Sequence, residues 1–209
     1  MLLVVATVAV LIVSRATPTN SRSPVPGVAP LLQCPGRDNS VQRGIVRHGL
    51  YQYFNYMRRG IASGVDMFKN GAFENNTRLM YAMKYDCDLE GNASKVLKSG
   101  GTLPHNQVGL RYESHKPGDE FLGAGEIRKA LNEWKTNSLA QFMFLNPYVP
   151  LFGCAHSYEN KQLKLICVFR IDTIEATNER FPPCQNHTDC KQYAKSTCHS
   201  KLCWAPFGL

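Results

Sequence analysis

The sequence predicts an α+β fold followed by a small cysteine-rich tail, and three observations carry this prediction. Apolar residues recur at helical spacing in the first two thirds of the chain, strand-like segments appear only from residue 148 onward, and four of the eight cysteines crowd into the 20 residues that end at Cys203. Helices first and strands second is the order typical of α+β domains. Too few apolar residues lie among those last cysteines to build a core, so we expect two disulfides to hold that segment.

The N-terminal segment has the pattern of a cleaved signal peptide over residues 1–16. Residues 2–13 are almost continuously apolar but too few to span a bilayer, which needs about 20 residues, and a small-x-small cleavage pattern ends at Ala16. Residues 17–33 are rich in proline and are interpreted as an extended leader. We therefore expect secretion, a mature chain that begins near Thr17, and no stable membrane insertion.

Three helices are expected before the strands. The first follows an N-cap offered by residues 38–40 and ends near Gly60 or Gly64. The second runs from about Asp86 and is stopped by a glycine pair at 100–101. Residues 102–125, which are polar and contain glycine and proline, are interpreted as a loop, and the third helix covers residues 125–134.

Two strands are expected next, over residues 148–155 and 163–171, joined by a hairpin loop at 157–161. In the second strand, alternate residues from Leu163 to Ile171 are apolar and share one face. The composition then breaks at a Pro-Pro pair, beyond which the cysteine-rich tail begins.

All eight cysteines are expected in disulfides, because an even number in a secreted chain is typical of an oxidising compartment. They are Cys34, Cys87, Cys154, Cys167, Cys184, Cys190, Cys198 and Cys203. The four tail cysteines should pair among themselves, in any of three ways. Cys154 and Cys167 should join across the hairpin, which leaves Cys34 for Cys87 by elimination. Glycosylation sequons begin at Asn75, Asn92 and Asn186, which suits surface loops of a secreted protein.

The formal net charge of +8 suggests anionic partners outside the cell, such as sulfated glycans or acidic cell surfaces. The alternative interpretation has equal weight: the charge only keeps the protein soluble, because its lysines and arginines are scattered along the sequence. The aromatic residues at 51–56 are interleaved with Arg58 and Arg59, a pattern known from nucleic-acid contacts. Their helical spacing makes them mainly core, and secretion argues against a nucleic-acid role.

Enzyme signatures are missing from the sequence. It contains no Gly-x-Ser-x-Gly, no phosphate-binding loop, no Cys-x-x-Cys pair, and no two histidines at His-x-x-x-His spacing. Glu126 and Glu133 lie seven residues apart on the third predicted helix and are interpreted as a solvated face. We therefore expect no catalytic residues and no cofactor.

Several segments resemble the CAP family, also called SCP/TAPS, and most of all the secreted venom-allergen-like proteins of parasitic nematodes. The resembling residues read VRHGL at 46–50, IASG at 61–64, MYAMKYDCDLEGNA at 80–93, FGCA at 152–155 and ICVF at 166–169. The tail resembles the cysteine-rich hinge of the same nematode proteins. The resemblance implies an α-β-α sandwich, a CAP domain over residues 34–178 and a hinge-like tail over residues 179–209.

The resemblance also implies a cleft that in many relatives holds two histidines and two glutamates around a divalent metal. Here His105 and Glu133 are the remnant candidates. Leu110 stands where the first glutamate is usual, and residues 139–146 contain no histidine. Two ligands make a weak metal site, so no metal is expected unless Glu113 or His115 replaces the missing ones.

The function implied is that of a secreted, non-catalytic protein that binds extracellular proteins or cell surfaces of a host, as an immunomodulator or an inhibitor of adhesion or haemostasis. An extracellular lipid or sterol carrier is the alternative, and a divergent metal-dependent hydrolase is the second alternative.

Overall fold

A computed structural model describes residues 32–38, 40–68, 78–114, 124–160, 162–171 and 182–206. All of them belong to one compact unit that starts at Leu31. The signal peptide, nearly all of the leader and the domain boundary expected at residue 178 lie outside the described residues. No helix in the described part of the chain combines the length and the apolar character needed to cross a membrane.

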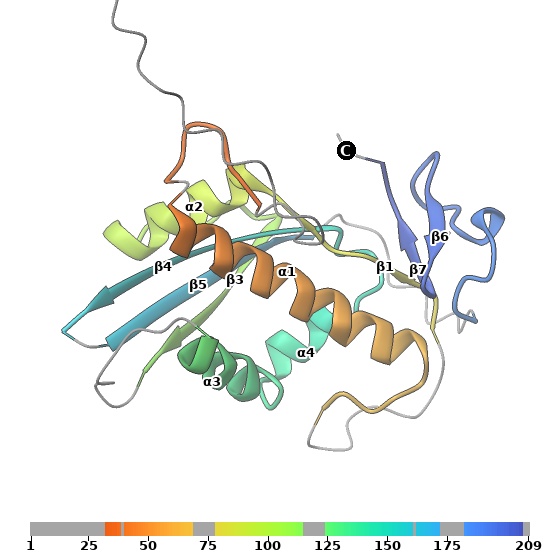
Figure 1. Cartoon of the computed structure of the whole chain (residues 1–209), viewed down its shortest axis with the longest axis horizontal. Helices are drawn as coiled ribbons and strands as arrows, with labels where there is room; N and C mark the ends of the chain where they lie inside the picture. The colour runs from red at the N-terminus through yellow and green to blue at the C-terminus, as the bar shows by residue number, and fades with distance from the viewer. Residues whose placement is uncertain are drawn as a thin grey trace, which may run out of the picture. The chain divides into compact units, whose positions relative to one another are not determined.

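The two longest helices follow the predicted bounds closely (Figure 1). Helix α1, Val41–Ala62, begins after Ser40, whose side chain accepts the first N–H bond. Helix α2, Cys87–Ser99, begins after Asp86, whose carboxylate accepts two backbone N–H groups. It ends at Gly100, which has φ of 68°, a left-handed conformation that glycine adopts without strain.

Two shorter helices lie between the strands. Helix α3, Ala124–Trp134, matches the third predicted helix. Helix α4, Ser138–Leu145, begins at the N-cap Asn137 and was not predicted. Its residues are apolar on nearly every side, so the sequence offers no helical periodicity there.

The main sheet has four strands in the order β2-β4-β5-β3. These are β2 (Lys84–Tyr85), β3 (Gln107–Glu113), β4 (Leu151–Glu159) and β5 (Gln162–Arg170). Strands β4 and β5 form an antiparallel hairpin, β3 lies antiparallel to β5, and β2 runs parallel to β4. Strand β3 is therefore an edge of the sheet.

Two predictions about this sheet were wrong. The segment 102–125 was expected to be a loop, but residues 107–113 form β3, because Leu110 and Tyr112 alternate with exposed neighbours and pack into the core. The hairpin loop expected at 157–161 is shorter, since β4 continues to Glu159 and β5 starts at Gln162. The turn contains Asn160 at φ of 50°, a conformation that asparagine tolerates.

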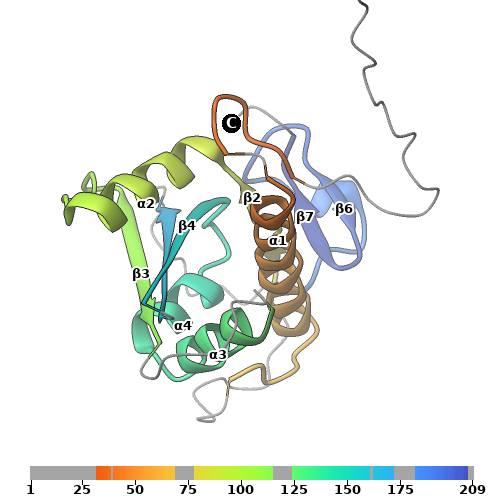
Figure 2. The same cartoon turned by 60° about the vertical axis from the view of Figure 1, so that its left-hand side comes forward.

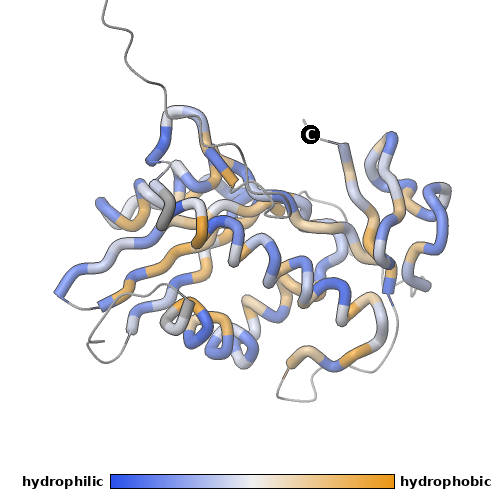
Figure 3. The backbone as a smooth tube through the Cα atoms, viewed as in Figure 1, coloured by the Kyte–Doolittle hydropathy of each residue, from blue (hydrophilic) through white to orange (hydrophobic). Residues whose placement is uncertain are grey.

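The sheet is covered on both faces, which confirms the predicted α-β-α sandwich (Figure 2). One face packs against α1, α3 and α4 through the larger apolar core, and the other packs against α2 through the smaller one. Figure 3 shows hydrophobic stretches along strand β5, which lies between these layers. The approach of α2 is close at Gly153 of β4, where an added Cβ would lie 2.2 Å from the backbone nitrogen of Glu90. Any larger residue at this position would push α2 off the sheet.

The tail forms a second small sheet in the order β1-β7-β6. It comprises β1 (Met80–Tyr81), β6 (Thr197–His199), β7 (Leu202–Trp204) and a short 3₁₀ turn, η1 (His187–Asp189). Strand β7 lies parallel to β1, which belongs to the segment that leads into α2. Through this pairing, the tail is joined to the body by backbone hydrogen bonds between β7 and β1.

The cysteines pair as Cys34–Cys87, Cys154–Cys167, Cys184–Cys198 and Cys190–Cys203. The tail cysteines pair only among themselves, as expected, and the structure selects one of their three pairings. Cys154 and Cys167 lie directly opposite each other on β4 and β5.

Candidate functional site

The cleft remnants predicted from sequence do not gather into one site. His105 is exposed in the turn before β3, and Glu133 is exposed near the end of α3. Leu110, which the resemblance aligns with a cleft glutamate, is 3% exposed and belongs to the main core. Ala140, within the 139–146 segment that the resemblance aligns with a histidine of the cleft, is fully buried in the same core. At both positions the side chain is apolar and packs in the core.

A groove of about 590 Å³, here called the β3 groove, lies at the edge of the main sheet. Its lining comes from four elements: Leu97, Arg111, Tyr112, Glu113, Ser114, Glu133, Gln162, Lys164 and Ile166. It includes Glu133 but not His105. His115, proposed as a replacement ligand, lies outside the described residues.

Polar groups of the β3 groove largely bind one another. Lys164 and Glu113 lie 3.9 Å apart across neighbouring strands. The Ser114 hydroxyl accepts the backbone N–H of Leu163 at 2.9 Å. The Trp134 indole donates to the carbonyl of Arg111 at 3.1 Å and so ties α3 to the strand edge. The groove holds charges of both signs at a solvent-facing surface, which is a poor setting for acid–base chemistry.

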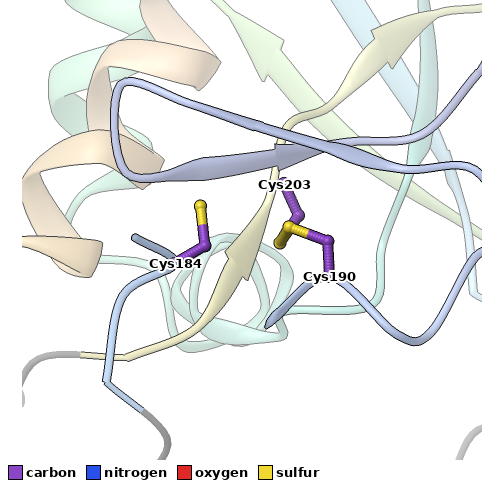
Figure 4. Close-up of side chains that lie close together, drawn as sticks. All are labelled: Cys184, Cys190 and Cys203. Atoms are coloured by element: carbon purple, nitrogen blue, oxygen red, sulfur yellow. A yellow bond between two sulfur atoms is a disulfide. The ribbon is translucent and has the colours of Figure 1, made fainter. Parts of the chain in front are cut away.

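Three side chains of a type that can bind metals lie close together in the tail. Across the described residues, one group of three histidine, cysteine or acidic side chains lies close enough to share an ion: Cys184, Cys190 and Cys203 (Figure 4). Their sulfur atoms lie within 4.8 Å of one another. All three are in disulfides, so none offers a thiolate, and the group is a structural sulfur cluster.

A buried ion pair joins α1 to α2. Arg47 donates to both carboxylate oxygens of Glu90, at 2.7 and 2.6 Å, and is 2% exposed. The Tyr85 hydroxyl donates to Glu90 at 2.7 Å and accepts the backbone N–H of Cys154. The hydrogen bond to Glu90 raises the pKa of Arg47, and burial raises the pKa of Tyr85 far above its usual range. The three side chains are thereby bound to one another inside the fold, as expected of a scaffold.

His156 of β4 is a second buried polar group. Its Nδ1 lies 2.8 Å from Nη1 of Arg43, and since arginine only donates, Nδ1 accepts. Burial, reinforced by the Arg43 charge, lowers the pKa of His156 to about 4. Its partner comes from a position 113 residues away, so no local pattern reveals it.

Arg58 is a third buried charge. Its guanidinium donates to four backbone carbonyls, those of Tyr81, Met143, Asn146 and Pro147. Burial lowers its pKa to about 9. The prediction that the 51–56 aromatics are mainly core fits Phe54, which is fully buried, but not Tyr56, which is 59% exposed. Arg59, the other cation of that pattern, is exposed.

The two described sequons differ in setting. Asn92 lies within α2 and its Nδ2 donates to Gln107 of β3 at 3.1 Å. Asn186 is exposed at the start of η1, where its Oδ1 accepts the backbone N–H of Thr188. Asn75 lies outside the described residues.

An α-β-α sandwich with a disulfide-bonded tail paired to its first short strand defines a CAP-type secreted-protein scaffold. The family model described as Ancylostoma-associated secreted protein related matches residues 55–169, and the chain belongs to that family as a divergent member. A search of curated proteins by sequence found no match.

Solved structures support the same scaffold. Ancylostoma-secreted protein Ac-ASP-7 is 25% identical with a TM-score of 0.63, and the match covers 78% of this chain and 91% of that one. A manganese-bound structure of Ac-ASP-7 is 24% identical with a TM-score of 0.66, covering 85% and 97%. Na-ASP-1 is 20% identical with a TM-score of 0.69, covering 84% of this chain and 49% of that chain.

Proposed function

We propose that this protein is a secreted, non-catalytic binding protein that acts through its outer surface on extracellular proteins or cell surfaces of a host. The observation that carries the proposal is the burial of Leu110 and Ala140 in the main core, at positions that the resemblance aligns with the family's cleft ligands. Apolar core side chains offer no ligand to a metal, which supports a role without metal chemistry.

Charge placement supports the same proposal. The buried charged groups Arg47, Glu90 and Arg58 bind one another or backbone carbonyls. Such groups hold helices in place and meet no substrate. Charges that remain available to a partner are therefore those on the exposed surface.

The β3 groove does not favour the lipid or sterol carrier. Its lining contains Arg111, Glu113, Glu133 and Lys164, and a bound sterol would remove water from these charged groups and offer them few hydrogen bonds in return. The hydrolase has no better support, because the groove places Glu133 without His105. One structure of Ac-ASP-7 is manganese-bound, so the experiment must include removal of divalent metal as a control.

The test is binding of the labelled mature protein to host leukocytes, platelets and endothelial cells, with and without EDTA. The expected result is saturable binding to at least one cell type, unchanged by EDTA and by the double variant His105→Ala/Glu133→Ala. This variant is also the matched control, because both side chains are exposed and their removal leaves the core intact. Absence of binding to all three cell types, or binding that EDTA abolishes, would overturn the proposal.

A further inference from the structure

The tail has a higher net positive charge per residue than the chain as a whole. Residues 182–206 contain Lys191, Lys195 and Lys201 against a single acid, Asp189. All three lysines are exposed, and none of them forms a salt bridge within the part of the chain that the structure describes. The carboxylate of Asp189 accepts the backbone N–H groups of Gln185 and Asn186, which lowers its pKa.

Disulfides gather these lysines from three separate segments of the tail. Lys191, Lys195 and Lys201 lie one, three and two residues from a bridged cysteine. With consecutive Cα atoms 3.8 Å apart, each lysine begins within about 11 Å of a cysteine of the cluster's two disulfides. The sulfur atoms of Cys184, Cys190 and Cys203 lie within 4.8 Å of one another (Figure 4). The lysines thus extend from one rigid centre.

Strand register places residues of the body and of the tail at the two ends of the same small sheet. Met80 pairs with Leu202, so Arg78 lies at the end of the small sheet where the β6–β7 turn holds Lys201. At the other end, Lys84 donates to the carbonyl of Pro206. Thr197 pairs with Trp204, which places Lys195 at that second end.

Two of the exposed lysines therefore mark opposite ends of the β1-β7-β6 sheet, Lys201 in the β6–β7 turn and Lys195 before β6. At about 3.3 Å per residue, a three-residue strand separates the two positions by at least about 10 Å. A single sulfate or phosphate reaches one of these lysines only. An extended chain that repeats its negative charge reaches both, as a linear sulfated glycan does.

We propose that the tail sheet, through Lys191, Lys195 and Lys201, is a binding site for linear sulfated glycans of the host cell surface. The inference rests on the proposed function and names its ligand class. Binding releases counterions from the glycan, so affinity falls steeply with salt in proportion to the number of lysines engaged. A site formed by three segments that disulfides hold together also requires a ligand long enough to span them.

The experiment measures binding of the mature protein to immobilised heparin across a sodium chloride series. The triple variant Lys191→Gln/Lys195→Gln/Lys201→Gln is expected to lose at least about tenfold in affinity at 150 mM salt and about two units of the log–log salt slope. The control variant Lys95→Gln/Lys98→Gln/Arg128→Gln removes the same charge from exposed positions of α2 and α3. It should change affinity less than twofold.

Equal losses in the two triple variants would mean that net charge alone binds heparin, and the proposal would be overturned. Two further probes test the ligand class. Desulfated heparin and short heparin fragments should compete at least tenfold more weakly than full-length heparin. Tighter binding to phosphatidylserine vesicles than to heparin would assign the lysines to a membrane surface and refute the glycan.

Binding experiments on host cells distinguish a failure of this inference from a failure of the proposed function. If the protein binds host cells equally well after heparinase treatment, the glycan site is wrong and the binding function stands. If it binds no host cell while still binding heparin through the tail lysines, the proposed function is wrong.

Discussion

Acid should destabilise this protein through one buried side chain, His156. In the folded state its pKa is lowered from 6.5 to about 4, first by burial and then by the neighbouring Arg43 charge. The charges of Glu90 and Asp38 act in the opposite direction and Arg47 reinforces Arg43. Because Arg43 donates to Nδ1, a protonated ring would face another donor.

The sign of the pH effect follows from proton linkage. Between pH 6.5 and about 4 the unfolded chain binds a proton on His156 that the folded chain does not, so the free energy of unfolding rises with pH. The contribution of neutral His156 to the free energy of unfolding is fully present above pH 6.5 and is lost as the pH falls toward 4. A difference of about 2.5 pKa units corresponds to about 3 kcal/mol, which is a large part of the stability of an ordinary domain.

The assay is urea unfolding with disulfides intact, followed by tryptophan fluorescence at several pH values from 7.5 to 4.5 and constant ionic strength. Trp134 is 1% exposed and reports on the main core. The control is His156→Gln, which keeps an oxygen acceptor for Arg43 but does not titrate. Between pH 7.5 and 4.5, we expect the free energy of unfolding of the wild type to fall by about 2 to 3 kcal/mol more than that of the variant. Parallel stability curves for the two proteins would refute the reasoning.

Four further outcomes are expected. Glu90→Gln should cost about 3 to 5 kcal/mol in urea unfolding, because it leaves a buried guanidinium without its counter-charge; a cost below 1 kcal/mol would contradict this. Arg58→Leu should destabilise by about 3 kcal/mol or more, since buried carbonyls lose their donor, and a near-neutral result would count against it. Zinc, magnesium or calcium should shift the melting temperature little, and His105→Ala should be nearly silent; a rise of several degrees abolished by that variant would indicate a surviving site. Peptide mapping of the secreted protein should find glycan at Asn186 but not at Asn92, whose Nδ2 already bonds to β3; an occupied Asn92 would refute this.

Elements with a strong local pattern were predictable from sequence. Helix α1 has apolar residues at helical spacing and a serine N-cap, and α2 has an aspartate before it and glycine after it, so both bounds were found. The paired cysteines of the hairpin followed from their places on two neighbouring strands. In each case the information lies within about twenty residues of the chain.

The missed features depend on distant contacts. Strand β3 alternates in polarity like a strand, yet the glycine and proline residues around it favoured a loop, and only pairing with β5 settles it. Arg47 and Glu90 were both visible in the resembling motifs, but their contact joins positions 43 residues apart. Helix α4 has no polar face to mark its period, because its exposed positions Leu139 and Phe142 are apolar as well.

An apolar side chain in the main core has a physical advantage over a carboxylate there. Leu110, which the resemblance aligns with a cleft glutamate of relatives, adds apolar area to the core, whereas a carboxylate without a partner is costly to bury. The same reasoning explains why the polar groups inside, such as Arg47 and Arg58, are those with hydrogen-bonding partners in the scaffold itself. Charged groups without such partners belong on the exposed surface, where the lysines of the tail lie within three residues of its bridged cysteines.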